Sequence, residues 1–179
     1  MLVFSEFLGI LGTFVKASTT PQMDKLARIT KDPDLKVELV FKNLPLPTGM
    51  TFLGLDDILV LEKKNGTVLR IVNGEMINQT LIDLNVANKS ERGLLGIAIS
   101  KNSVDNTTNV FLYFTESRYK ADDREICDVR NHCSSGNPLG HRLYRYELVN
   151  NELINPQLVL SLPSNPGARH LGGVITFGP

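Results

Sequence analysis

Several residue types and patterns are scarce or missing in this sequence, and their absence excludes whole classes of function. Tryptophan is absent, and aromatic residues make up only 7% of the 179 residues. The 19 basic and 19 acidic residues balance, and no basic run concentrates the positive charge that a nucleic-acid surface needs. No apolar run approaches the roughly 20 residues of a membrane-spanning helix. We therefore expect neither a nucleic-acid partner nor a membrane span.

Short catalytic and metal-binding motifs are missing as well. No Ser-His-Asp order can be assembled, no glycine-rich loop has the spacing that cradles phosphates, and no carboxylate cluster has the spacing of a calcium loop. Valine, isoleucine and leucine are plentiful, so the chain can form a packed β core. The pattern of strands is therefore the main source of information.

One pattern occurs three times along the chain. Each copy opens with glycine and apolar residues, passes through a turn and should continue into a strand of β-branched and aromatic residues. The copies begin at Thr48, Gly93 and His170, and the third is cut off at Pro179. A recurring strand–turn–strand unit is typical of repeat architectures, in which one unit cannot bury its apolar faces alone. We therefore expect the chain to be part of a larger β-repeat protein.

Each of the first two units is predicted to contain four strands. The strands expected in the first unit are 48–53, 58–62, 67–72 and 77–86. Those expected in the second are 95–100, 110–116, 141–148 and 153–162, with a polar insertion over 117–140. Four antiparallel strands joined in sequence form a propeller blade, although a two-sheet sandwich also gives many short strands. We predict an all-β fold, an incomplete β-propeller of about two blades plus the first strand of a third.

Two dipeptides mark the tightest turns of the first unit. Asn65-Gly66 and Asn73-Gly74 are predicted to connect its later strands, because both residue types tolerate positive φ.

The N-terminal 36 residues are interpreted as a lead-in to a propeller domain at 37–179. Residues 2–15 are mostly apolar and run into Val15-Lys16-Ala17, whose small residues are typical of a signal-peptidase site. No Lys or Arg precedes this run and Glu6 interrupts it, so an ordinary N-terminal strand or helix is the alternative. Further on, we expect a short helix over 23–29 and a strand over 37–41.

Cys127 and Cys133 are the only cysteines, and both lie in the insertion. Together with His132 they offer three metal ligands, but structural zinc sites usually have four and no second pair exists here. A disulfide that closes a small polar loop fits better, with two free thiols as the alternative. A disulfide would place the protein in an oxidising compartment.

A functional site is expected where loops enter the innermost strands of the blades. These strands line the central channel of a propeller. The three entering loops are 45–49, 88–93 and 163–173. Their glycines allow close approach of the backbone to a neighbouring blade or a ligand.

His170 is the strongest catalytic candidate in these loops. An imidazole accepts a proton near neutral pH, which suits removal of a hydroxyl proton from a substrate. The alternative is a histidine that caps a turn or binds a backbone carbonyl. Arg169 precedes it. Glu91 and Arg92 in the neighbouring loop are either rim residues of the site, or a surface ion pair or turn residues. His141 is interpreted as the first residue of a strand.

The order of these segments resembles the soluble quinoprotein glucose/sorbosone dehydrogenase family. The segments that carry the resemblance are Glu91–Ala98, Val110–Glu116, Arg142–Tyr146, His170–Gly173 and Phe177–Pro179, and 56–62 with 66–70 look like the family's first blade. Members are six-bladed β-propellers that use pyrroloquinoline quinone (PQQ) and calcium to oxidise aldose sugars at C1. The resemblance covers roughly Val37 to Pro179. It implies the N-terminal part of a secreted or periplasmic enzyme, inactive alone, with an aldose substrate and an external electron acceptor.

The resemblance also implies roles for single residues. His170 would be the general base that takes the C1 hydroxyl proton as hydride moves to the quinone. Glu91 and Arg169 would lie near the cofactor, although Glu91 stands where the family often has glutamine. Leu171 replaces a polar residue of some members, so substrate preference is expected to differ. The other quinone and calcium ligands belong to later blades. The alternative function is a non-catalytic propeller that binds a protein or glycan partner.

Overall fold

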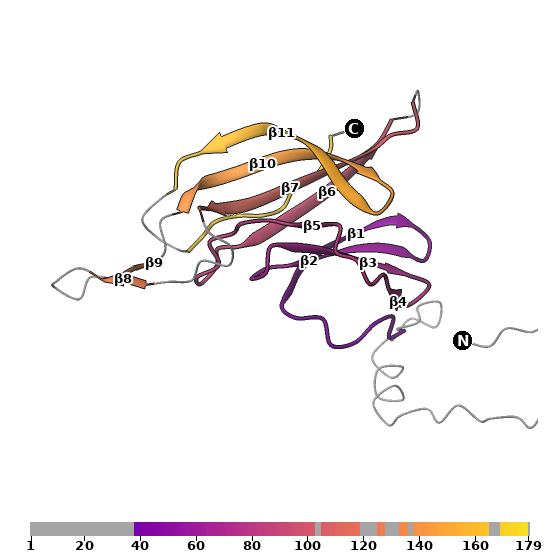
Figure 1. The fold of residues 1–179 in the computed structure, drawn as a ribbon, viewed down its shortest axis with the longest axis horizontal. Helices are drawn as coiled ribbons and strands as arrows, with labels where there is room; N and C mark the ends of the chain where they lie inside the picture. Colours follow the sequence, from indigo (N-terminus) through magenta and orange to yellow (C-terminus); the bar gives the residue numbers. More distant parts are fainter. Residues whose placement is uncertain are drawn as a thin grey trace, which may run out of the picture. The chain divides into compact units, whose positions relative to one another are not determined.

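The structure is a computed structural model that describes residues 38–102, 105–118, 125–127, 133–135, 138–164 and 169–178. The predicted signal peptide, the helix over 23–29 and His132 lie outside these residues. The chain divides into two compact units, Met1–Val40 and Phe41–Pro179. Every described strand belongs to the second unit (Figure 1), which is all-β as predicted. No helix within the described ranges is long and apolar enough to cross a membrane.

The first sheet is an antiparallel meander. Its strands are β1 (Pro47–Gly54), β2 (Asp57–Glu62), β3 (Thr67–Val72), β4 (Glu75–Met76) and β5 (Ile82–Asp83). They are ordered β1-β2-β3-β4, and β5 pairs with β3 as well. β2 and β3 are nearly continuous runs of leucine and β-branched residues, and most of their side chains are buried. Such runs are typical of strands that are covered on both faces.

Both predicted turns of this sheet are confirmed. Asn73 and Gly74 have φ values of 52° and 76°, as a two-residue turn with positive φ at both central positions requires. Gly66 has a φ of 73°, and its amide donates to the carbonyl of Glu62 at 3.1 Å. These turns fix the register of β2, β3 and β4.

The second sheet is a four-stranded antiparallel meander, and all four predicted strands are confirmed. They are β6 (Leu94–Lys101), β7 (Thr108–Ser117), β10 (Pro138–Val149) and β11 (Glu152–Leu162), paired in the order β6-β7-β10-β11. The insertion between β7 and β10 contains a separate pair, β8 (Glu125–Cys127) and β9 (Cys133–Ser135). The backbone register places Cys127 opposite Cys133. A disulfide between them stays a prediction.

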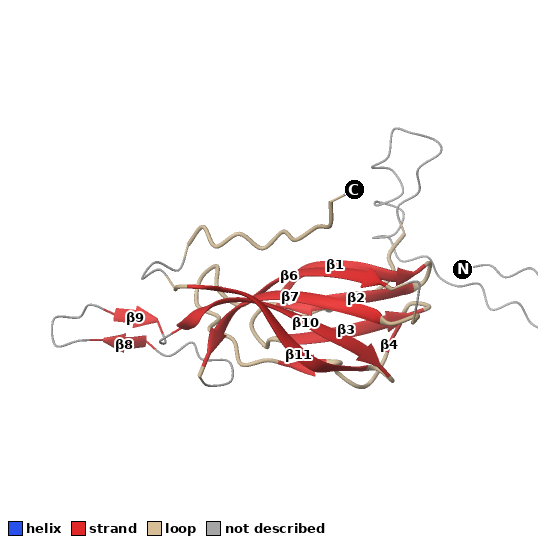
Figure 2. Ribbon diagram, turned by 90° about the horizontal axis from the view of Figure 1, so that it is seen from above, coloured by secondary structure: helices blue, strands red, loops and turns tan. Residues whose placement is uncertain are grey.

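The two sheets share one hydrophobic core. Figure 2 shows both sheets turned by 90° from the view of Figure 1. Leu59 and Leu61 of β2 are fully buried, as are Leu94 of β6 and Leu112 of β7, and all four belong to the same cluster. Burying a leucine side chain stabilises a fold by roughly 1.5–3 kcal/mol. Because both sheets contribute to this cluster, each depends on the other for its stability.

The predicted fourth strand of the first unit, 77–86, is wrong in extent. Two two-residue strands, β4 and β5, pair with β3 in its place. Ile77 and Leu81 still donate to backbone carbonyls of β3, at 2.9 Å each, but the polar residues 78–80 between them are exposed. These three residues leave the ladder because they have no apolar side chain to bury.

Two other predicted strands are absent from the described residues. Residues 38–44 form no strand; Phe41 and Leu44 instead pack on a small cluster of β2 and β3 side chains. Residues 169–178, expected to begin the strand of a third blade, form no ladder. His170 and the two glycines that follow Leu171 have positive φ, which is incompatible with a regular strand.

Candidate functional site

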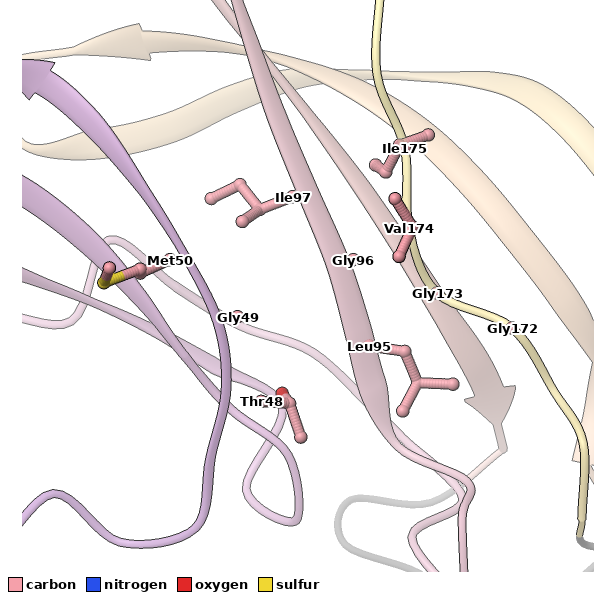
Figure 3. A pocket seen from close by; sticks show the side chains of 10 residues that line it. All are labelled: Thr48, Gly49, Met50, Leu95, Gly96, Ile97, Gly172, Gly173, Val174 and Ile175. Atoms are coloured by element: carbon pink, nitrogen blue, oxygen red, sulfur yellow. The ribbon is translucent and has the colours of Figure 1, made fainter.

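The three repeated openings meet on one side of the second unit. Thr48 at the start of β1 donates its hydroxyl to the carbonyl of Leu94 at 2.7 Å, so β1 and β6 begin side by side. The segment 172–175 lies along the other side of β6 (Figure 3). At Gly96 the approach is so close that a Cβ atom would come within 2.0 Å of the carbonyl oxygen of Gly173. Three segments far apart in sequence therefore run together.

These segments line an open groove of about 680 Å³. It is bounded by β1, β6 and the segment 172–175. The residues that line it are Thr48, Gly49, Met50, Leu95, Gly96, Ile97, Gly172, Gly173, Val174 and Ile175. Four of the ten are glycine, so much of the wall is backbone. The loops that carry Glu91 and His170 enter these segments, so these residues are candidates for the groove's polar end.

The structure brings two of the predicted site residues together. The backbone N–H of His170 donates to Oε2 of Glu91, although the two residues are 79 positions apart. Both side chains are exposed, and so is Arg169. His170 has a φ of 60°, a left-handed conformation that residues with a Cβ adopt rarely. Glu91 is therefore a neighbour of the candidate base.

A second contact holds the same loop, and sequence reasoning missed it. The hydroxyl of Tyr113 on β7 donates to the carbonyl of Leu171 at 3.1 Å. The register of β6 and β7 places Tyr113 opposite Gly96. Burial raises the pKa of the Tyr113 phenol, so it remains a hydrogen-bond donor at neutral pH.

Arg92 is not a surface residue, so its interpretation as half of a surface ion pair is wrong, whereas the alternative of a turn residue agrees with the structure. Its exposed fraction is 2%, and its amide donates to the carbonyl of Lys89 at 3.0 Å in the turn before β6. Burial lowers the pKa of its guanidinium, which still carries its charge at neutral pH. Arg92 is therefore a buried positive charge.

His141 is buried as well, with 7% of its surface exposed. Its Nδ1 lies 3.1 Å from the hydroxyl of Thr115, and its ring stacks on Tyr113 with centroids 6.2 Å apart. Burial lowers the pKa of His141, and the positive charges of Arg92 and Arg142 lower it further. The imidazole that supports Tyr113 is thus held neutral.

This lowered pKa makes the stability of the fold depend on pH. As pH falls below about 6.5, the unfolded chain takes up a proton at His141 that the folded chain resists, so the stability present above that pH is lost. We expect the urea concentration at the midpoint of unfolding to decrease as the pH is lowered from about 7 to about 5. In His141→Gln this decrease should be smaller. An equally steep slope in the variant would contradict this origin.

Two comparisons with known proteins bear on this arrangement. A family model described as glucose/sorbosone dehydrogenase matches residues 44–179. No curated protein matches the chain in sequence. The family is one of sugar-oxidising dehydrogenases that are in general PQQ-dependent, and the match confirms the resemblance drawn from the motifs. The matched residues include both sheets, the groove, Glu91 and His170. Because the family model matches most of the chain, the chain belongs to the glucose/sorbosone dehydrogenase family.

Proposed function

We propose that this chain is the N-terminal part of a PQQ-dependent aldose dehydrogenase that oxidises the C1 hydroxyl group of its sugar. Its two large sheets would be neighbouring blades of a six-bladed propeller, in a domain beginning near residue 37. The adjacent starts of β1 and β6 support this reading, because innermost strands of neighbouring blades converge on the central axis. The segment 172–175 beside β6 would open the third blade.

One observation carries the functional part of the proposal. The family match includes the sequence His170-Leu171-Gly172-Gly173, and this sequence lies against β6, where two long-range hydrogen bonds hold it. His170 is therefore part of the matched region, and its backbone is held two residues before Gly172, which lines the groove.

His170 is proposed to act as the general base. Oxidation of the C1–OH group of a cyclic aldose to the lactone removes one proton from oxygen and one hydride from carbon. The imidazole would take the proton from the hydroxyl oxygen. The C1–O bond would become a double bond as hydrogen leaves C1 with its bonding electron pair, as hydride. PQQ, when bound, supplies the acceptor for that hydride. General-base catalysis of this kind contributes about 10²–10⁴-fold to a rate.

The described residues fit one edge of such a cofactor. PQQ carries several carboxylates, which guanidinium groups bind well, and Arg169 is exposed next to His170. Glu91 is less suited to contact the anionic quinone directly, because its carboxylate already accepts the His170 amide. Calcium needs several oxygen ligands, and the described part of the chain offers no group of three His, Cys, Asp or Glu side chains for it. The calcium ligands are therefore proposed to come from other blades.

Reconstitution tests this function. The full-length protein, incubated with PQQ and calcium, is expected to reduce an artificial dye only when an aldose is present, with the protein lacking PQQ as the control. The oxidised product should be the lactone rather than an open-chain acid formed at another carbon. Sugar binding without any dye reduction would instead favour the non-catalytic propeller.

A further inference from the structure

We propose that Glu91 and Tyr113 act together as a backbone clamp that positions His170 through its main chain rather than through its imidazole. This inference rests on the proposed function, because it assumes that His170 is the reacting base. It assigns Glu91 a role in holding the loop and adds Tyr113, which lies outside the loops that enter the groove.

The loop that carries His170 has an unusual backbone conformation. His170 has a φ of 60°, and Gly172 and Gly173 have φ values of 70° and 145°. The glycines adopt such angles without strain, but a residue with a Cβ does not. Left-handed residues with side chains persist where the surrounding structure holds them, and they gather at functional sites. Contacts from other parts of the chain must therefore keep His170 in this conformation.

The two contacts supply that hold on both sides of one dipeptide. Glu91 accepts the N–H of His170, and Tyr113 donates to the carbonyl of Leu171 at 3.1 Å. The first contact fixes the peptide group between Arg169 and His170. The second fixes the peptide group between Leu171 and Gly172. Neither contact uses the imidazole, so its nitrogens remain available for proton transfer.

Each clamp residue is itself held in place. Glu91 lies in the turn before β6, where the Arg92 amide bonds to Lys89 at 3.0 Å and the Leu94 amide bonds to Lys63 at 3.0 Å. Tyr113 is fixed by the β-ladder and by its ring contact with buried His141. The clamp thus connects the loop to two strands of the second sheet. A carboxylate acceptor and a neutral phenol donor suit the peptide N–H and C=O that they meet.

The test separates the acceptor role of Glu91 from its charge. In the full-length protein without PQQ, Glu91→Ala and Tyr113→Phe are expected to speed amide hydrogen exchange across 170–172 by about tenfold, the effect of losing one hydrogen bond. Glu91→Gln keeps an acceptor oxygen and should restore most of the protection that Glu91→Ala loses. Tyr144→Phe, a matched loss of one phenol hydroxyl from neighbouring β10, should leave this exchange unchanged.

Kinetics of the protein loaded with PQQ and calcium, with glucose as the probe, complete the test. Glu91→Ala and Tyr113→Phe should lower kcat by about tenfold with KM nearly constant, because a misplaced base weakens only the transition state. Unchanged exchange, unchanged kcat, or a Glu91→Gln protein as impaired as Glu91→Ala would each overturn the clamp. If the parent protein lacks dehydrogenase activity, the proposed function fails while faster exchange in the variants still supports the backbone hold.

Discussion

Replacing His170 by alanine is expected to lower sugar-dependent turnover by at least about 10²-fold, the low end of general-base catalysis. The loss should fall mainly on kcat, because the imidazole is proposed to interact with the C1 hydroxyl proton as the bond to it breaks. Steady-state dye reduction at a series of sugar concentrations measures kcat and KM separately.

Two controls make the His170 result specific. PQQ binding, followed by its absorbance, should survive in His170→Ala, because the substitution removes no cation. His132→Gln is the matched histidine control: this residue lies in the insertion over 117–140, outside the loops that carry Glu91 and His170, so turnover should stay within the same order of magnitude. Turnover of His170→Ala equal to that of the parent protein would remove His170 from the mechanism.

The sequence carried enough information to predict most of the ladder, because strands with a buried face leave a strong periodic signal. β1, β2, β3, β6, β7, β10 and β11 coincide with predicted strands. The failures are informative. The strand expected over 77–86 breaks at three exposed polar residues, and the one expected over 37–41 has an apolar sequence but no pairing partner among the described residues. Apolar character predicts burial, whereas pairing depends on neighbours that are remote in sequence.

The candidate site was predictable in part for the same reason. Glu91 and His170 were expected on one rim because each was predicted to precede an innermost strand, and the structure joins them through the His170 amide. Tyr113 and His141 lie within strands, where aromatic and polar side chains give no local sign that they reach a distant loop. Arg92 looked like a charged turn residue, yet it is 2% exposed. Only the pairing of β6, β7 and β10 in one sheet brings Tyr113 against the ring of His141 and its hydroxyl to the carbonyl of Leu171.

Replacing Gly96 by alanine is expected to disturb the site as strongly as removal of the base. Its new Cβ would lie 2.0 Å from the carbonyl oxygen of Gly173 and 3.0 Å from Ile175. The first of these neighbours is backbone, which cannot rotate away as a side chain does, so the segment 172–175 must move off β6. Overpacking of this kind typically costs about 1–3 kcal/mol, and a displacement of about 1 Å at a reacting group can reduce a rate by about 10²-fold.

The matched control for this substitution is Gly178, three residues beyond the segment 172–175. Gly178 has no atom within 4 Å of the position that a Cβ would take, so Gly178→Ala adds the same methyl group without a collision. We expect Gly96→Ala to speed hydrogen exchange over 169–178 and to lose turnover, and Gly178→Ala to do neither. Gly96 has no side chain that could take part in the reaction. A loss of turnover in Gly96→Ala would therefore result from displacement of the His170 loop from β6. Full activity and unchanged exchange in Gly96→Ala would mean that the loop does not rest on this strand.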